Sequence, residues 1–380
     1  MAAKINSEQD KKGFAAKLKI RSIQFLVLVV VVVIADFVLA SIFLPKNAKD
    51  AARISRLSNY YNHGFAALVS GEKSYGTLSY PFFTNSLGLA DGYCRQVPKL
   101  AKNKRRILLM GDSFMEGVGF PFQKTVAGLL QQKMDSTTIE IINAGCSSYS
   151  PRLHFLRLKH LLQQDSLRVN EIVCFMDYSD VMDELVYEDF EPKAVSPLNN
   201  FKNDFFSWLV GNSMLTSVFF LIRQQAFVSK NNDDPNAQFV YWVKTDNGFL
   251  QKAPHFFALR SGWHRTEKEE AVRHGKALAL SNAQQLYELA KQQGIKFSIG
   301  VYPPPGFYAL PAADLRSTYL LWEEFCTQRQ LPFINLHRVF FGDTTAQNHK
   351  NSIQYFISND SHWNEAGHQL VADTLYNYLR

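Results

Sequence analysis

Two short motifs near opposite ends of the chain hold the three residue types that act together in acyl-transfer chemistry. Ser113 ends a Gly-Asp-Ser motif that follows the apolar run Ile107–Met110. Asp360 and His362 stand close together just before the periodic run Glu365–Leu379. A serine hydroxyl becomes a nucleophile when a base takes its proton and a third group orients that base. The sequence therefore predicts Ser113 as the nucleophile, His362 as the base and Asp360 as its orienting partner.

Each of these residues also has a structural interpretation. A serine at a strand-to-helix turn often caps the helix, and Asn359–Ser361 has the composition of a turn. Asp360, His362 and His368 are zinc-ligand types, but they lack the His-x-x-x-His spacing of a helical metal site. We therefore expect no metal and no cofactor. The combination and order of the two motifs favour catalysis over these alternatives.

Alternating patterns predict the elements that must position these residues. Five apolar runs are typical of buried strands: Ile107–Met110, Ile139–Ile142, Ile172–Met176, Phe297–Tyr302 and Pro332–Leu336. Five segments between or after them have helical spacing: Thr125–Met134, His154–Leu162, Ala277–Gln293, Leu315–Gln328 and Asn364–Leu379. This alternation favours an α/β domain, a parallel sheet with helices on both faces and its site at the carboxyl ends of the strands. Four residues follow such ends: Ser113, Gly145, Asp177 and Tyr302.

Three segments resemble the motif blocks of the GDSL or SGNH hydrolases. Gly111–Phe114 is similar to the first block, Asn143–Gly145 to the second, and Asp360–His368 to the last. The resemblance covers roughly residues 106–380. It implies a three-layer, flavodoxin-like sheet and acyl-ester chemistry on a Ser-His-Asp triad. The Asp-x-His-Trp spacing of the last block is similar to the branch that contains polysaccharide O-acetyltransferases, such as the alginate acetylation proteins.

The same resemblance implies an oxyanion hole. The main-chain N–H groups of Ser113 and Gly145 would be two of its donors. The third block normally supplies an asparagine, but here it reads Asp177–Asp180, so Ser179 stands at the asparagine position. A hydroxyl is shorter than a carboxamide. We therefore expect that Ser179 does not act as an essential third donor.

A long apolar segment precedes the domain. Ser22–Leu44 would extend about 34 Å as a helix, enough to cross a bilayer. Met1–Arg21 carries six Lys/Arg against two Asp/Glu, which predicts a cytoplasmic N-terminus and a domain outside the cytoplasm. A signal peptide cleaved after Val38–Ala40 is the alternative, but the apolar region is longer than usual for one. Within the span, we expect Asp36 to reach headgroups or water, with a contact to a partner helix as the alternative.

The net charge of +7 does not indicate nucleic-acid binding. Residues 1–21 carry +4 and residues 45–56 carry +3, whereas residues 57–380 carry only +1. Basic residues next to an apolar span suit an anionic leaflet, and the domain has no basic stripe with interleaved aromatics. The cysteines show no Cys-x-x-Cys spacing, and no disulfide can be assigned: Cys94, Cys146, Cys174 and Cys326.

The composition divides the chain into four parts: a basic cytoplasmic tail at 1–21, a transmembrane anchor at 22–44, a linker or edge segment at 45–103 and a catalytic domain at 104–380. Residues at about 184–270 interrupt the strand–helix rhythm and are expected to form an insertion. Its aromatic side chains could be a lid that stacks on sugar rings, or a helical cap that buries them against one another.

The sequence thus predicts a membrane-anchored serine esterase or deacylase. The resemblance points to acyl esters, including acetylated carbohydrate of the envelope or of exported polysaccharide. If a sugar hydroxyl takes the acyl group instead of water, the protein is an O-acetyltransferase. A catalytically weak accessory protein of polysaccharide export is a third alternative, favoured by the missing asparagine. The expected partners are the substrate, the membrane and envelope proteins, with no nucleic acid.

Overall fold

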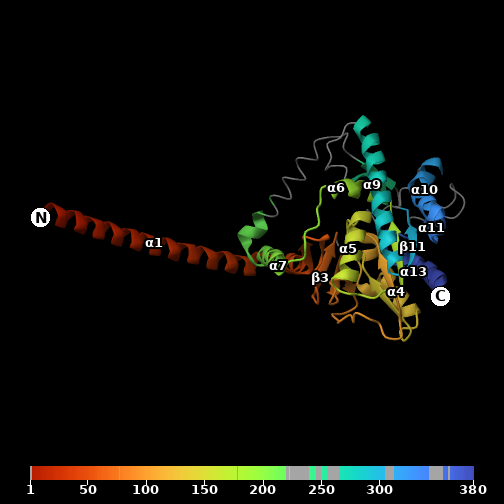
Figure 1. Ribbon diagram of the computed structural model, residues 1–380, viewed down its shortest axis with the longest axis horizontal. Helices are drawn as coiled ribbons and strands as arrows, with labels where there is room; N and C mark the ends of the chain where they lie inside the picture. Colours follow the sequence, from red (N-terminus) through yellow and green to blue (C-terminus); the bar gives the residue numbers. More distant parts are fainter. Residues whose placement is uncertain are drawn as a thin grey trace.

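The computed structural model of this chain has an extended part and a folded body. It describes residues 2–76, 78–177, 179–219, 222, 239–244, 250–255, 265–303, 312–341, 354–357 and 360–380. A single helix, α1 (Ala2–Phe43), projects away from an α/β body that holds the other elements (Figure 1). Among the described residues, one helix is long and apolar enough to cross a membrane, Lys19–Phe43, with a mean hydropathy of 3.0. Its length and composition fit a membrane span or a signal sequence.

The body is built on a five-stranded parallel sheet, which confirms the predicted fold class. Its strands lie in the order β12-β11-β8-β6-β7. Their bounds are β6 (Arg105–Met110), β7 (Ile139–Asn143), β8 (Glu171–Met176), β11 (Lys296–Val301) and β12 (Phe333–Asn335). Counted along the chain, this is the flavodoxin-like arrangement, in which the second strand lies outside the first. All five predicted apolar runs became strands, with ends shifted by one or two residues.

Helices cover both faces of the sheet. They are α3 (Ser113–Glu116), α4 (Val126–Lys133), α5 (Pro151–Gln163), α6 (Asp180–Val186), α9 (Arg265–Gln292), α10 (Ala312–Arg329), α11 (Leu336–Phe341) and α13 (Glu365–Leu379), with a short 3₁₀ turn at Phe122–Lys124. Side chains alternate between the faces along β6. Leu108 and Met110 join a core with α5, α9 and α10, whereas Ile107 and Leu109 join a second core with α4 and α13. These two cores make the body three layers thick.

The segment expected as a linker or edge is a folded layer. It contains α2 (Lys46–Ile54), β1 (Ser55–Ser58), β2 (Asn62–Phe65), β3 (Ser70–Tyr75), β4 (Leu78–Thr84) and β5 (Ala90–Asp91). The last three strands form an antiparallel sheet, which we call the antiparallel layer. Phe65, Tyr80 and Phe82 pack with Leu153 and Leu156 of α5 in a third core. The layer is therefore fixed against the body by buried apolar contacts.

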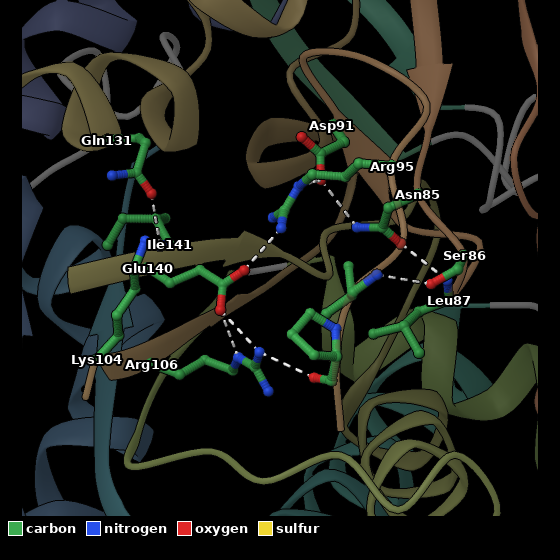
Figure 2. A network of polar contacts seen from close by, with 12 residues as sticks. Asn85, Ser86, Leu87, Asp91, Arg95, Lys104, Arg106, Gln131, Glu140 and Ile141 are labelled. Atoms are coloured by element: carbon green, nitrogen blue, oxygen red, sulfur yellow. Dashed lines mark hydrogen bonds and ion pairs between the residues drawn. The ribbon is translucent and has the colours of Figure 1, made fainter. Parts of the chain in front are cut away.

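A buried ionic network also fixes this segment to the parallel sheet (Figure 2). The Arg106 side chain is fully buried; its Nε donates to Glu140 Oε2 over 2.8 Å, and its other nitrogens donate to three main-chain carbonyls. Arg95 donates to Glu140 over 2.7 Å and to Asp91 over 2.8 Å, and Asp91 accepts from Asn85. A buried guanidinium needs such partners, since an unpaired buried charge costs several kcal/mol.

The predicted insertion is described only in part. It includes α7 (Pro197–Asn212) and an antiparallel pair, β9 (Phe239–Lys244) and β10 (Leu250–His255). Much of the rest, with most of the aromatic side chains expected to form a lid or cap, lies outside the described residues. In the described part, α7 packs on α2 and also touches α1.

Candidate active site

Ser113 lies at the turn between β6 and α3. It is the first residue of α3, and the Asp112 carboxylate caps that helix by accepting a main-chain N–H from its first turn. Tyr302, which follows β11, donates its hydroxyl to Asp112 Oδ1. A Cβ on Gly111 would lie 2.7 Å from the Cβ of Met115, so a glycine permits this close turn. Asp112 therefore has a structural role in this turn, and Ser113 follows it at the carboxyl end of β6.

The structure brings Ser113, His362 and Asp360 together. His362 Nε2 lies 2.8 Å from Ser113 Oγ, and His362 Nδ1 lies 2.5 Å from Asp360 Oδ1. The same carboxylate oxygen accepts the main-chain N–H of His362 over 2.8 Å. These contacts fit an imidazole that carries its proton on Nδ1 and accepts the serine proton at Nε2. Asn364 caps α13 directly after this loop, which fixes where the loop ends.

The Asp360 carboxyl is held in its charged form. Burial opposes its ionisation, but the hydrogen bonds and charge of His362 outweigh that effect, and the hydroxyl of Tyr75 adds to them. Together they lower the pKa of Asp360 below its ordinary value. A charged carboxylate at this position can stabilise a protonated imidazole.

Tyr75 is a site residue that the sequence did not reveal. It ends β3 in the antiparallel layer, and its hydroxyl donates to Asp360 Oδ2 over 2.8 Å. The same hydroxyl lies 2.8 Å from His362 Nδ1, and the two rings meet edge to face at 5.0 Å. One tyrosine in a polar strand, far upstream in the sequence, gives no signal of this contact. Only the packing of the layer against the last loop creates it.

The antiparallel layer also touches α3. Lys73 of β3 forms an ion pair with the buried carboxylate of Glu116, the last residue of α3. The other oxygen of Glu116 accepts from the main-chain N–H and the hydroxyl of Ser147, over 2.8 and 2.6 Å. Burial opposes the charge, yet Lys73 holds the pKa of Glu116 below its ordinary value. One strand, β3, therefore contacts both the helix that begins with Ser113 and the pair of His362 and Asp360.

The other predicted oxyanion-hole groups have internal partners. The Gly145 N–H donates to Asn143 Oδ1 over 2.9 Å, and Asn143 Nδ2 donates to the Met115 carbonyl over 3.0 Å. Ser179 precedes α6, and its hydroxyl and N–H both donate to Asp177 Oδ1 over 2.7 Å. Each of these donors thus has an acceptor two residues earlier in its own loop. Their roles in an oxyanion hole stay predictions.

Asp112, next to Ser113 in the chain, belongs to a group of buried carboxyls with Asp177 and Asp180. Burial raises the pKa of Asp112, and burial together with the charge of Asp112 raises the pKa of Asp177 to about 7. Burial and the charges of Asp177 and Asp112 raise the pKa of Asp180 well above its ordinary value. The Asp180 carboxylate accepts the Asp177 N–H over 2.8 Å. Among the described residues, no group of His, Cys, Asp and Glu side chains has the arrangement of a metal site.

No family model and no curated protein matches this sequence. Among solved structures, the chain is similar to an acetyl xylan esterase, AlAXEase, at 12% identity and a TM-score of 0.40, over 72% of this chain and 100% of that one. A GDSL-like lipase from Bacteroides thetaiotaomicron matches at 12% identity and 0.39, over 74% and 91%. A lipolytic protein of the G-D-S-L family from Desulfitobacterium hafniense matches at 10% identity and 0.38, over 73% and 100%.

Proposed function

We propose that this protein is a serine esterase or deacylase, anchored to a membrane by α1, with Ser113, His362 and Asp360 as its catalytic residues. The observation that carries the proposal is the unbroken series of contacts from Ser113 Oγ to His362 Nε2, and from His362 Nδ1 to Asp360. A nucleophile, its base and an orienting group within hydrogen-bonding distance are what acyl transfer requires.

Each step of the reaction uses these three groups. Ser113 Oγ attacks the ester carbonyl carbon while its proton passes to His362 Nε2. The C–O bond to the alcohol then breaks, and His362 returns the proton to the departing oxygen, which leaves the acyl group on Ser113. Water attacks this acyl-enzyme with His362 as base, and the acid leaves as Ser113 Oγ regains its proton. Asp360 stabilises the imidazolium in both halves of the reaction.

Stabilisation of the oxyanion is proposed to begin with the Ser113 N–H. It belongs to the first turn of α3, where N–H groups have no partner within the helix. The N-terminal end of a helix also favours negative charge. The Gly145 N–H could act as a second donor only if its hydrogen bond to Asn143 broke. The Ser179 hydroxyl could do so only if its hydrogen bond to Asp177 broke. The Ser113 N–H is therefore the donor best supported.

Acyl transfer to a sugar hydroxyl is the second candidate function. It is favoured by the Asp-x-His-Trp block and its resemblance to polysaccharide O-acetyltransferases. Trp363 of that block is fully buried and packs edge-on against Phe114 and Tyr302, 5.1 and 5.0 Å between ring centres. Release of free acetate, against its appearance on an added polysaccharide acceptor, distinguishes hydrolase from transferase.

A fluorophosphonate probe tests the serine mechanism. The full-length protein in detergent should be labelled covalently and should lose its activity on acetyl esters. Ser113→Ala should not be labelled, whereas Ser136→Ala, which removes an exposed hydroxyl in the loop after α4, should be labelled like the wild type. Equal labelling of Ser113→Ala would overturn the proposal.

We also propose that the domain lies outside the cytoplasm, as the basic residues before the apolar segment indicate. An alkaline phosphatase fused to the C-terminus should be active in bacteria. An inactive fusion, together with an active cytoplasmic reporter at the same position, would reverse the orientation.

A further inference from the structure

Helix α7 has its apolar side turned away from the protein. Its outward face carries large apolar residues at helical spacing: Leu198, Phe201, Phe205 and Trp208, of which Phe201 is 64% exposed. The side chains on its inward face are small or polar. Gly211 lies against Ala52 of α2, and Asp204 forms an ion pair with Arg56 over 3.1 Å. A helix on a water-exposed surface has the opposite arrangement, with apolar residues inward.

The helical turn after α7 repeats this inversion. Residues 214–219 are helical, and their large apolar side chains face outward, with Leu215 and Phe219 both 65% exposed. The buried side chains there are hydroxyls: Ser213 and Ser217. Ser217 donates to the Val210 carbonyl of α7, which joins the two helical segments. We call the exposed apolar side chains of this region the aromatic stripe: Leu198, Phe201, Phe205, Trp208, Leu215, Phe219 and Ile222. An exposed apolar patch of this kind marks an interaction surface.

The stripe is continuous with the apolar segment of α1. Asp36 of α1 accepts the Leu215 N–H over 2.7 Å, and the rings of Phe37 and Trp208 lie 5.4 Å apart. Asp36 is only 9% exposed, so the expectation that it reaches headgroups or water is wrong and the partner-helix alternative holds. It stands about 10 Å before the end of α1 at Phe43, inside the apolar segment. A carboxylate at that depth needs a donor, and the start of a helix supplies one together with a favourable dipole.

We propose that the aromatic stripe is a membrane-binding surface. It would lie at the boundary between the headgroups and the acyl chains of the bilayer that α1 crosses. The inference rests on the proposed anchoring by α1. If α1 crosses the bilayer, its contacts at Asp36 and Phe37 hold α7 and the following turn at the outer edge of the same bilayer (Figure 1). Trp and Phe side chains prefer that boundary.

Charge around the stripe fits the same occupant. Lys202 lies on the outward side of α7, where a long side chain can bury its stem among apolar groups and keep its ammonium at the headgroups. Lys46 and Arg53 of α2 are also largely exposed, although each is paired with an acidic side chain, Glu72 and Asp50. Basic residues near a bilayer surface each add about 1 kcal/mol of attraction to anionic lipid. The body is thus attached at two places, by α1 and by the stripe, which fixes its orientation on the membrane.

Site-specific fluorescence in lipid nanodiscs tests this surface. Cys94 is the exposed cysteine, and the other three are buried, so a Cys94→Ser background allows single labelling with an environment-sensitive dye. Three full-length variants are compared: Phe205→Cys on the stripe, Val30→Cys within α1 and Ser136→Cys in the exposed loop after α4. Each is measured with lipids that carry a nitroxide quencher near the headgroup or deep in the acyl chain. Ester hydrolysis by each variant checks that the body is folded.

The expected result is strong quenching at Phe205→Cys by the shallow nitroxide, strong quenching at Val30→Cys by the deep one, and none at Ser136→Cys. If the dye at Phe205→Cys has the emission of a water-exposed dye while the dye at Val30→Cys is quenched, the stripe proposal is overturned. The proposed anchoring by α1 would still stand. A dye in an apolar environment that no lipid quenches would also overturn it, since a protein would then cover the stripe. Loss of quenching at Val30→Cys would overturn the anchor itself, and the stripe proposal with it.

Discussion

Ser113 and His362 reach the site from the parallel sheet and its loops, whereas Tyr75 and Lys73 reach it from β3 of the antiparallel layer. The first region supplies groups that would exchange protons or form bonds. The second supplies groups that hold those residues in place, through Asp360 on one side and Glu116 on the other. Chemistry and the support of the reacting groups are thus divided between two parts of one chain. The effects of substitutions on activity should therefore differ between the two regions, both in size and in kind.

Removing the nucleophile or base should have the largest effect. Ser113→Ala and His362→Ala are each expected to lose about 10⁴-fold or more in kcat, because they act as one unit. For the same reason, the double variant should be little worse than either single one. Ester hydrolysis measured on all three proteins checks this. Ser113→Ala with near wild-type turnover would end the acyl-enzyme mechanism.

Removing the orienting carboxylate should cost less. Asp360→Ala keeps the groups that form bonds and transfer protons, so its loss in kcat should be about one to two orders of magnitude smaller than that of Ser113→Ala. The Asp360 pKa is lowered in the folded site, so its contribution is present at neutral pH and is lost as pH falls through that pKa. A loss as large as that of Ser113→Ala would assign Asp360 a direct part in the chemistry.

The antiparallel layer is tested at Tyr75. Tyr75→Phe removes one hydrogen bond to a charged carboxylate, a loss of about 1.5–3 kcal/mol or roughly 10–100-fold in kcat. The acid limb of the kcat profile should also move to higher pH, because the pKa of Asp360 rises without this donor. Tyr93→Phe, at a largely exposed tyrosine just after β5, is the matched control and should change neither. If Tyr75→Phe lowers only stability and leaves the pH profile unchanged, the tyrosine is merely structural.

The sequence predicted the parallel sheet well, because each of its strands is marked by a pattern within a few consecutive residues. Each strand of the parallel sheet is a short apolar run, and residues at its carboxyl end must lie at one edge of the sheet. The placement of Ser113 after β6, and of Asp360 and His362 before α13, followed from those two facts.

The contacts that were not predicted depend on packing between distant segments. β3 is a polar strand, so nothing in its own pattern indicates that Tyr75 meets Asp360. Gly145 follows its strand as expected, but the bond from its N–H to Asn143 depends on how that loop folds back on α3. Asp36 was expected to lie near headgroups, but its carboxylate accepts the main-chain N–H of Leu215, far along the chain. Sequence periodicity carries no information about such pairs.

A smaller effect is expected at Ser179. Its hydroxyl donates to Asp177, so Ser179→Ala should reduce kcat only a few-fold, well short of the roughly 10²–10³-fold that follows loss of an oxyanion donor. Steady-state kinetics on an acetyl ester measure this directly. A loss in the larger range would show that Ser179 turns toward the oxyanion during the reaction, and that a residue beside the parallel sheet completes the hole.

Acid should lower the stability of the packing between the two regions, independently of the catalytic residues. His154 of α5 lies beside the core of the antiparallel layer; it is fully buried, and neither ring nitrogen has a hydrogen-bond partner among the described residues. Burial lowers its pKa from 6.5 to about 3. Between those values the unfolded chain binds a proton that the folded chain does not. Its contribution to stability is complete above pH 6.5 and falls as pH drops toward 3, by about 1.4 kcal/mol per pH unit.

His154→Leu removes the titrating group and leaves no unpaired nitrogen, so its free energy of unfolding should depend less steeply on pH over that range. Urea unfolding at a series of pH values measures the slope. The buried His368 of α13, whose pKa burial lowers to about 3, packs against Trp363 and Phe120 and provides the comparison. Hydrogen exchange in acid should then rise in β3 before β6 in the wild type, and His154→Leu should delay the rise in β3 alone. If both strands respond together in both proteins, the layer and the sheet unfold as one unit, and the division between them is limited to the active site.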